Sequence, residues 1–402
     1  MTVDRARLGR RIEELARIGG SGTSVTRLGL SREEQQGHDL VASWLTARGG
    51  AARRDPAANR YVRFGGEGRA VLVGSHGDSV PEGGRFDGAL GVCCAVEAVE
   101  SLLDDGARFV RPVEVVAWCD EEGARFGIGL FGSCAAFGRL PDRASERVDR
   151  AGVTVAAALR AIGEAGDPAK ARRGDDVAAY LELHIEQGPR LERRGLPLGV
   201  VSEIVGIFHG RVIVSGRADH AGATVMGARK DTLAAASEMV LAVERIASAV
   251  PDAVGTVGEI SVRPGAKNVV PGETVFSLDI RAPRDDDVER VLRELRAEMR
   301  RIGDARGVTS TVDVLARVPA TAMDEGLQDL LLRSAKAVGV EAPLMISGAG
   351  HDAQNPALAG VPTGMLFVRS TGGSHTPTES ASLDDAVLGT EALARALREL
   401  AA

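Results

Sequence analysis

Hydrophobic and polar residues follow two different periods along the first part of the chain. Residues 5–18 and 33–48 carry apolar side chains at helical spacing, whereas 71–75 and 113–118 are short continuous apolar runs typical of buried strands. A mostly apolar helix over 89–103 connects these two runs. This strand–helix–strand order predicts an α/β sheet covered by helices, with functional loops at the strand ends.

The pattern changes from about Val205 onwards. Strands in which apolar and polar residues alternate are expected over 210–219, 258–264 and 275–283, with a helix near 230–249. Two strands, a helix, further strands and a final helix form an α+β unit of ordinary domain size.

The final helix of this unit is expected over 285–303. Its apolar stripe consists of Val288, Leu292, Leu295 and Met299. After about residue 317 the chain returns to the pattern of its first part, with a last clear strand at 364–368. We therefore predict an inserted domain over 206–317 and a discontinuous first domain made of 1–205 and 318–402.

Charge and composition exclude several classes of protein. The chain has 49 Lys and Arg against 56 Asp and Glu, a formal net charge of −7, with both signs scattered, so neither a nucleic-acid surface nor a polybasic membrane patch is expected. No apolar run is long enough to span a membrane, and the first twenty residues are too charged for a secretion signal. We expect a cytoplasmic protein. Its cysteines lack metal-binding spacing and are predicted to be buried free thiols, namely Cys93, Cys94, Cys119 and Cys134.

Residues able to bind metal follow two of the predicted strands. His76 and Asp78 come directly after the first strand, and a carboxylate two residues on can orient the imidazole for a metal. Asp87 follows in a glycine-flanked loop, and the three acids 120–122 end the next strand. Because adjacent acids repel one another when buried, they indicate a cation, and histidine with carboxylate suits two ions of zinc or another first-row divalent metal.

The individual roles follow from this set. Asp87 is placed to bridge the two ions, with His76 on one and Glu122 on the other, and Glu121 is the candidate general base that takes a proton from water. His184 and His375, both in polar glycine-rich settings, are expected to complete the ligands. The remaining histidines include His38, expected at the surface, and His209, expected to be structural.

The motifs together resemble those of the hydantoinase/carbamoylase amidases, a branch of the aminoacylase and carboxypeptidase family of dinuclear metallohydrolases. They run along nearly the whole chain in the family's order: GSHGDSVPEGGRFDGALGV, DEEGARFG, ELHIEQGP, ADHAGAT, SGAGHDA and SHTPTE. The resemblance implies a mixed-sheet catalytic domain with an inserted α+β dimerisation (lid) domain. It also implies that one ion is held by His76, Asp87 and His184 and the other by Asp87, Glu122 and His375.

The resemblance further implies a homodimer in which His220 reaches the partner's site and stabilises the oxyanion. Asn268 and Arg281 match positions that bind a substrate carboxylate, and the pocket lining is expected to include Gln187, Gly350 and His351. From the residues alone, a surface ion pair of Arg281 with a neighbour such as Asp279 is the favoured interpretation, and a loop histidine without a role explains His220 equally well.

The implied activity is hydrolysis of the carbamoyl C–N bond of an N-carbamoyl-L-amino acid, giving the amino acid, carbon dioxide and ammonia. The ions would be zinc, or manganese, cobalt or nickel, and the substrate a small ureido compound with a carboxylate. Alternatives are an allantoate amidohydrolase or β-ureidopropionase with the same chemistry, an exopeptidase or aminoacylase, and a non-catalytic dimeric binding protein. His184 argues against an exopeptidase, whose relatives usually carry an acid there.

Overall fold

The computed structural model describes residues 2–173 and 175–402. The chain divides into two compact units, Met1–Ser202 with Ala322–Ala402, and Glu203–Thr321. Each unit encloses its own hydrophobic core. The insertion predicted over 206–317 lies within the second unit.

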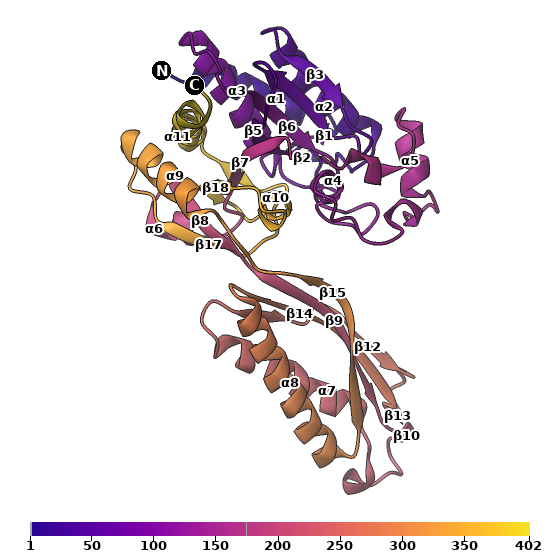
Figure 1. Ribbon diagram of the computed structural model, residues 1–402. Coiled ribbons are helices and arrows are strands. Elements are labelled where there is room, and N and C mark those ends of the chain that lie inside the picture. The colour runs from indigo at the N-terminus through magenta and orange to yellow at the C-terminus, as the bar shows by residue number, and fades with distance from the viewer. Residues whose placement is uncertain (1, 174) are drawn as a thin grey trace. The chain divides into compact units, whose positions relative to one another are not determined.

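The first unit is built on a mixed sheet, as predicted for its α/β class (Figure 1). The strands run in the order β16-β8-β18-β7-β5-β6-β4-β3, and β17 pairs with β8. The neighbours β18, β7, β5 and β6 are parallel, whereas β8, β4 and β3 pair antiparallel. The strands are β3 (Ala51–Arg54), β4 (Arg60–Phe64), β5 (Ala70–His76), β6 (Val113–Trp118), β7 (Val177–Ile185), β8 (Leu198–Ile204), β16 (Thr321–Ala322), β17 (Leu344–Ser347) and β18 (Thr363–Val368).

Helices cover this sheet and bury the apolar runs recognised in the sequence. Every residue of β5 and β6 is buried, as expected for central parallel strands. The helix α3 packs on β5 and β7 and lies beside α11, and α1, α2 and α9 complete this layer (Figure 1). The helices are α1 (Arg5–Ala16), α2 (Arg32–Thr46), α3 (Ala89–Asp104), α4 (Phe131–Ala136), α5 (Val155–Ala161), α6 (Arg190–Arg194), α9 (Glu325–Ala337), α10 (Gln354–Leu358) and α11 (Leu383–Ala401).

The expectation that His38 lies at the surface is wrong. His38 is 1% exposed, and its ring lies where it would meet a Cβ added to Gly77, in the loop after β5. The buried face of α2 carries Val41 and Leu45 but also Glu34, Gln35 and His38, so three of its inward residues are polar. A stretch that looks solvated because of its composition therefore packs against the loops at the end of the sheet.

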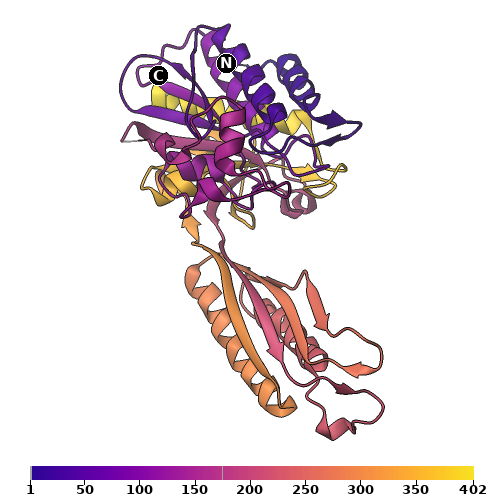
Figure 2. The ribbon, with the colours of Figure 1, turned by 90° about the vertical axis from the view of Figure 1, so that its right-hand side faces the viewer.

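The second unit is an α+β domain with its helices against a twisted antiparallel sheet (Figures 1 and 2). Burial alternates strictly along β14, whose inward side chains meet α7 and α8. The stripe predicted on α8 is confirmed, because all four of its residues are buried. The elements are β9 (Gly206–Ser215), β10 (Asp219–His220), α7 (Thr232–Ser248), β11 (Val254–Thr256), β12 (Ile260–Arg263), β13 (Val269–Val270), β14 (Glu273–Ala282), α8 (Asp285–Arg306) and β15 (Thr309–Val318).

The cysteines and helices agree with the expected character of the chain. All four cysteines are free; Cys134 is half-buried and the other three are buried. Among the described helices, none combines the length and the apolar character needed to cross a bilayer.

Candidate metal centre

The candidate ligands gather where parallel strands end. His76 is the last residue of β5 and aligns with Trp118, the last residue of β6, which the acids 120–122 follow. His184 is the penultimate residue of β7, the neighbour of β5 on its other side. Because the carboxyl ends of parallel strands meet at one edge of the sheet, segments more than a hundred residues apart deliver side chains to one place.

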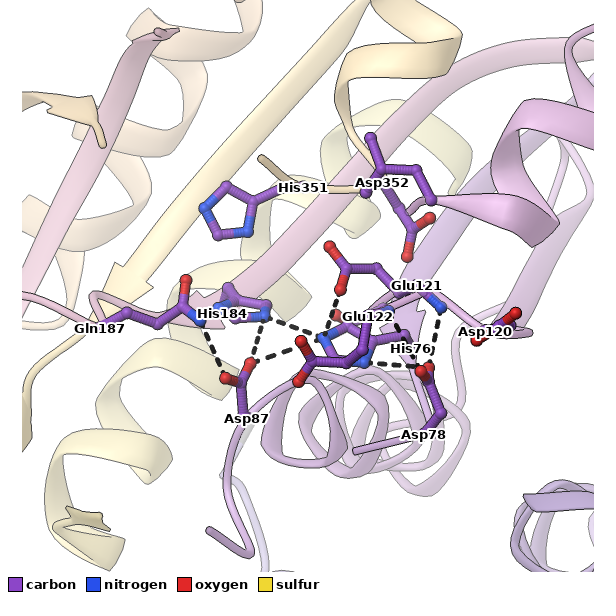
Figure 3. A network of polar contacts seen from close by, with 12 residues as sticks. His76, Asp78, Asp87, Asp120, Glu121, Glu122, His184, Gln187, His351 and Asp352 are labelled. Atoms are coloured by element: carbon purple, nitrogen blue, oxygen red, sulfur yellow. Dashed lines mark hydrogen bonds and ion pairs between the residues drawn. The ribbon is translucent and has the colours of Figure 1, made fainter. Parts of the chain in front are cut away.

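The first group of ligands consists of two histidines and a shared carboxylate. Nε2 of His184 lies 3.2 Å from Oδ1 of Asp87, and Nε2 of His76 lies 3.5 Å from the same oxygen. The two Nε2 atoms are 3.3 Å apart (Figure 3). All three side chains are buried. Unprotonated ring nitrogens facing a carboxylate in this way form a site that a divalent cation can fill.

The second group uses the other oxygen of the same acid. Nε2 of His375 lies 3.3 Å from Oδ2 of Asp87 and 3.3 Å from Oε2 of Glu122. In each group the ligand atoms lie within 4.8 Å of one another. Asp87 thus belongs to both groups, one oxygen in each, as an acid between two cations would.

Glu121 stands beside the first group. Its Oε2 lies 3.8 Å from Nε2 of His76, and its side chain is nearly buried. Asp78 supports both residues: its Oδ1 lies 3.3 Å from Nδ1 of His76 and accepts the backbone N–H of Glu121 at 3.0 Å. Oδ2 of Asp78 accepts the N–H of Glu122 at 3.1 Å. A carboxylate behind the ring is what fixes the tautomer of a ligating histidine.

The charges of the site interact strongly. Burial raises the pKa of Glu121 well above its usual range, and burial together with Asp87 raises the pKa of Glu122 to about 7. Burial opposes ionisation of Asp87 as well, but the three histidines that face it hold its pKa well below the usual range. The hydrogen bond to Asp87 raises the pKa of His375 to about 9. Without a cation, Glu121, Glu122 and His375 therefore hold protons more strongly than the same groups in water, as expected where several carboxyl groups are buried together.

The predicted pocket residues of the first unit lie close to these ligands. Gln187, with φ of 61°, donates from Nε2 to Oδ2 of Asp87 at 2.8 Å. His351 is buried, its Nε2 is 2.8 Å from Oγ of Ser347, and its ring stacks edge-on against His184 with centroids 4.5 Å apart. Gly350 directly precedes it. In the structure Gln187 and His351 therefore contact the ligands themselves.

Several polar residues that support the site were not recognised from the sequence. Oε1 of Glu379 accepts the N–H of Asp87 at 3.0 Å, and the hydroxyl of Ser374 lies 3.0 Å from Oδ2 of Asp87. Two residues before His184 on β7, the buried Glu182 accepts a hydrogen bond from the hydroxyl of Ser75 at 2.8 Å. The signal for Glu379 was present, since it ends the SHTPTE motif, but its role depends on a contact across most of the chain.

Three further predicted residues lie in the second unit. His220 on β10 is exposed, and β10 pairs with β13, which begins directly after Asn268. Nδ1 of His220 accepts two backbone N–H groups at 3.0 Å, so the neutral ring carries its proton on Nε2. Arg281 on β14 forms a two-point contact with Asp279, with both N···O distances 3.1 Å. The ion pair considered from the sequence is therefore present.

Known proteins share this arrangement of motifs. Residues 72–399 match the model of peptidase family M20/M25/M40. The chain is 39% identical over 403 residues to an N-carbamoyl-L-amino acid amidohydrolase of Geobacillus stearothermophilus, covering 98% of each chain. It is 34% identical over 397 residues to an allantoate amidohydrolase of Bacillus subtilis (strain 168), covering 97% and 96%. A solved hydantoinase/carbamoylase family amidase from Burkholderia ambifaria superposes with a TM-score of 0.90 at 39% identity, covering 100% of this chain and 99% of that one.

Proposed function

The chain belongs to peptidase family M20/M25/M40, and we propose that within it the protein hydrolyses the carbamoyl C–N bond of N-carbamoyl-L-amino acids. The resemblance to the hydantoinase/carbamoylase amidases is confirmed by full-length relatives and superposed structures. The observation that carries the proposal is the sharing of Asp87 by two histidine–carboxylate groups with Glu121 beside them.

The enzymes of this family depend on metal, and the residues here suit it. Oδ1 of Asp87 and Oε1 of Glu122 are buried without a hydrogen-bond partner within residues 2–173 and 175–402, which favours a cation beside them. Imidazole and carboxylate donors without thiolate suit zinc, and also manganese, cobalt or nickel. In the proposed assignment His76 and His184 would hold one divalent ion, Glu122 and His375 would hold a second, and Asp87 would serve both.

Bound divalent ions supply Lewis acidity, which polarises the scissile carbonyl and acidifies water. Glu121 takes a proton from the attacking water and delivers it to the leaving nitrogen. The carbonyl carbon gains a hydroxyl group, its bond to the terminal nitrogen breaks, and ammonia leaves. The remaining carbamate loses carbon dioxide and frees the amino acid. The low water exposure of Glu121 suits this role, because a buried carboxyl accepts a proton more readily than an exposed one.

The proposal includes a homodimer in which the partner subunit's His220 completes each site. The tautomer of His220 supports this role, since an Nε2–H can donate to the oxyanion that forms on the carbonyl. The edge strand β12 and the strand β15 carry exposed apolar residues, Ile260 at 51% and Leu315 at 64%, which suits pairing with a second copy. Asn268 and Arg281 are the proposed partners of the substrate carboxylate, Arg281 exchanging its contact with Asp279 for it.

A second candidate substrate is allantoate, favoured by relatives of 34–36% identity that carry this activity in their names. β-Ureidopropionase chemistry would use the same residues. The histidine at position 184 argues against an exopeptidase. The presence of Glu121 argues against a non-catalytic binding protein. The free cysteines suit the cytoplasm, where thiols stay reduced.

The deciding experiment is ammonia release from a panel of N-carbamoyl-L-amino acids, N-carbamoyl-β-alanine, allantoate and a dipeptide. The enzyme is assayed as purified, after chelation, and after addition of zinc, manganese, cobalt or nickel. We expect chelation to abolish ammonia release and one of the metals to restore it, with N-carbamoyl-L-amino acids turned over fastest. Preference for allantoate would transfer the proposal to the second candidate. Absence of ammonia from every ureido compound, with metal bound, would refute it.

A further inference from the structure

Two buried carboxylates hold the turn that carries Glu121. The backbone N–H of Asp120 donates to Oε1 of Glu34 at 2.8 Å. The next two N–H groups, of Glu121 and Glu122, donate to the two oxygens of Asp78. Three consecutive amides of the turn thus donate to oxygens of two buried carboxyl groups.

The carbonyl groups of the same turn are held on the other side. The carbonyl oxygens of Cys119 and Asp120 accept from Gly132 at 2.8 Å and Phe131 at 3.1 Å, and that of Glu121 accepts from Leu130 at 2.6 Å. With both its N–H and its C=O groups bonded, the turn has little freedom to shift. The direction of the Glu121 side chain is therefore set by the groups that hold this backbone.

Asp120 gives the turn its direction without joining the metal centre. Its φ is 51°, and its side chain is fully buried and points away from the ligands in Figure 3. The Asp120 side chain packs against Gly29, and a Cβ added to Gly29 would overlap the Asp120 carboxyl group. Side chains of successive strand residues face opposite sides, so leaving the strand conformation at Asp120 is what lets Glu121 and Glu122 both face the site.

Glu34 reaches this turn from the first turn of α2. Ser31 caps that helix and Glu34 stands three residues later, the spacing of a capping box. In a capping box the glutamate returns to the N–H of the cap residue. Here Oε2 of Glu34 accepts the N–H of Leu30 at 2.8 Å and the thiol of Cys119 at 3.0 Å, which leaves Oε1 for Asp120.

We propose that Glu34 is a positioning residue for the general base: it fixes the left-handed turn at Asp120 and so aims Glu121 at the substrate. The side chain of Glu34 is fully buried. Its hydrogen bonds go to Leu30, Gln35, Cys119 and Asp120, which belong to neither candidate ligand group. The inference rests on the proposed function for the role of Glu121. A glutamate that only caps α2 would instead affect stability and leave turnover unchanged.

The test compares Glu34→Gln with Glu33→Gln, the exposed neighbour in the same helical turn. Both enzymes are loaded with metal to equal content and assayed for kcat and KM. We expect Glu34→Gln to lower kcat roughly 10- to 100-fold with KM changed less than about threefold, because a small misplacement of a reacting group has this effect. Glu33→Gln should behave as the wild type. Equal kcat for the two variants would overturn the proposal.

A double-substitution cycle separates positioning from a general loss of order. In the wild-type background Glu34→Gln should lower kcat tenfold or more. If Glu34 acts through Glu121, the same substitution should lower the residual kcat of a Glu121→Gln enzyme less than about threefold. Losses that multiply independently in the double variant would contradict the proposal. Should Glu34→Gln fail to fold, Gly29→Ala displaces the same turn from its other side and should give the same fall in kcat with KM retained.

A measurement without turnover keeps this proposal distinct from the proposed function. Amide hydrogen exchange is followed by mass spectrometry in peptides that cover 119–122, with and without zinc. Glutamine offers one acceptor oxygen where Glu34 accepts from both Leu30 and Asp120. Exchange in these peptides should therefore be about tenfold faster in Glu34→Gln and unchanged in Glu33→Gln. Unchanged exchange would refute the role of Glu34 even in an active enzyme. A wild type that is silent on every ureido substrate would instead refute the proposed function.

Discussion

Asp78 contacts His76 and the backbone of Glu121 with one oxygen atom: Oδ1 lies 3.3 Å from Nδ1 of the ring and accepts the N–H at 3.0 Å. A candidate metal ligand and the candidate general base are thereby fixed by a single carboxylate. Movement of the Asp78 side chain would change both contacts. This coupling makes Asp78 a sensitive position for both metal affinity and turnover.

Replacing Asp78 by asparagine should weaken metal binding and turnover together. The amide keeps a carbonyl oxygen for only one of the two backbone N–H groups and no longer carries the charge that orients His76. Loss of such a supporting carboxylate lowers metal affinity by about 10- to 100-fold. Titration of the metal-free protein with zinc measures the affinity. An affinity equal to that of the wild type would show that His76 needs no orienting acid.

The substitution Glu121→Gln should abolish most turnover while leaving metal in place. A glutamine cannot accept a proton, and positioned acid–base catalysis contributes about 10²- to 10⁴-fold. Glu122→Gln serves as the contrasting variant, because its side chain lies 3.3 Å from His375 and belongs to a ligand group. Metal content by elemental analysis and kcat at saturating substrate distinguish the two. Near-normal kcat of a metal-loaded Glu121→Gln enzyme would rule out the general-base role.

Gly88 should tolerate no side chain, because it lies against the ring of His76. Its φ is 60°, and a Cβ built there would overlap the imidazole. Gly106 is a matched control, since its φ is 75° but a Cβ meets open space. Gly106→Ala should lower the free energy of unfolding by only the roughly 1 kcal/mol that a left-handed backbone costs a residue with a side chain. Gly88→Ala should lose metal affinity in addition. Equal metal affinities in the two variants would contradict the contact.

Acid should destabilise the protein through His38. Burial, followed by the nearby Arg60, lowers the pKa of His38 to about 3, with Arg27 also opposing the proton and Asp78 favouring it. The unfolded chain protonates this histidine near pH 6.5, so between about pH 6.5 and 3 it binds more protons than the folded protein does. Stability is therefore full above pH 6.5 and falls as the pH falls, by up to about 1.4 kcal/mol per pH unit.

Urea unfolding from pH 7 to 5 measures this dependence, with His38→Gln as the comparison. The variant should show a shallower loss of unfolding free energy over that range, because the other titrating groups are common to both proteins. Parallel curves for the two proteins would mean that His38 is protonated or relocated in the folded state.

Many elements were predictable because their causes are local. The buried strands β5 and β6, the amphipathic stripe of α8 and the order of the ligand-bearing loops follow from residue patterns within short windows. The spacing of His76, Asp78 and the acids 120–122 was informative because each set directly follows a strand. Backbone preference and apolar periodicity act over a few residues, so these predictions needed no knowledge of the packing.

Other features depended on contacts between distant segments. Nothing in the local pattern distinguishes Asp120 from the two glutamates that follow it; only the packing against Gly29 and the acceptor on Glu34 turns its side chain away. The burial of His38 follows from how α2 packs, and the support of Asp87 by Glu379 joins residues 292 positions apart. These arrangements result from long-range packing and from the need of buried polar groups for partners, which no short stretch of sequence contains.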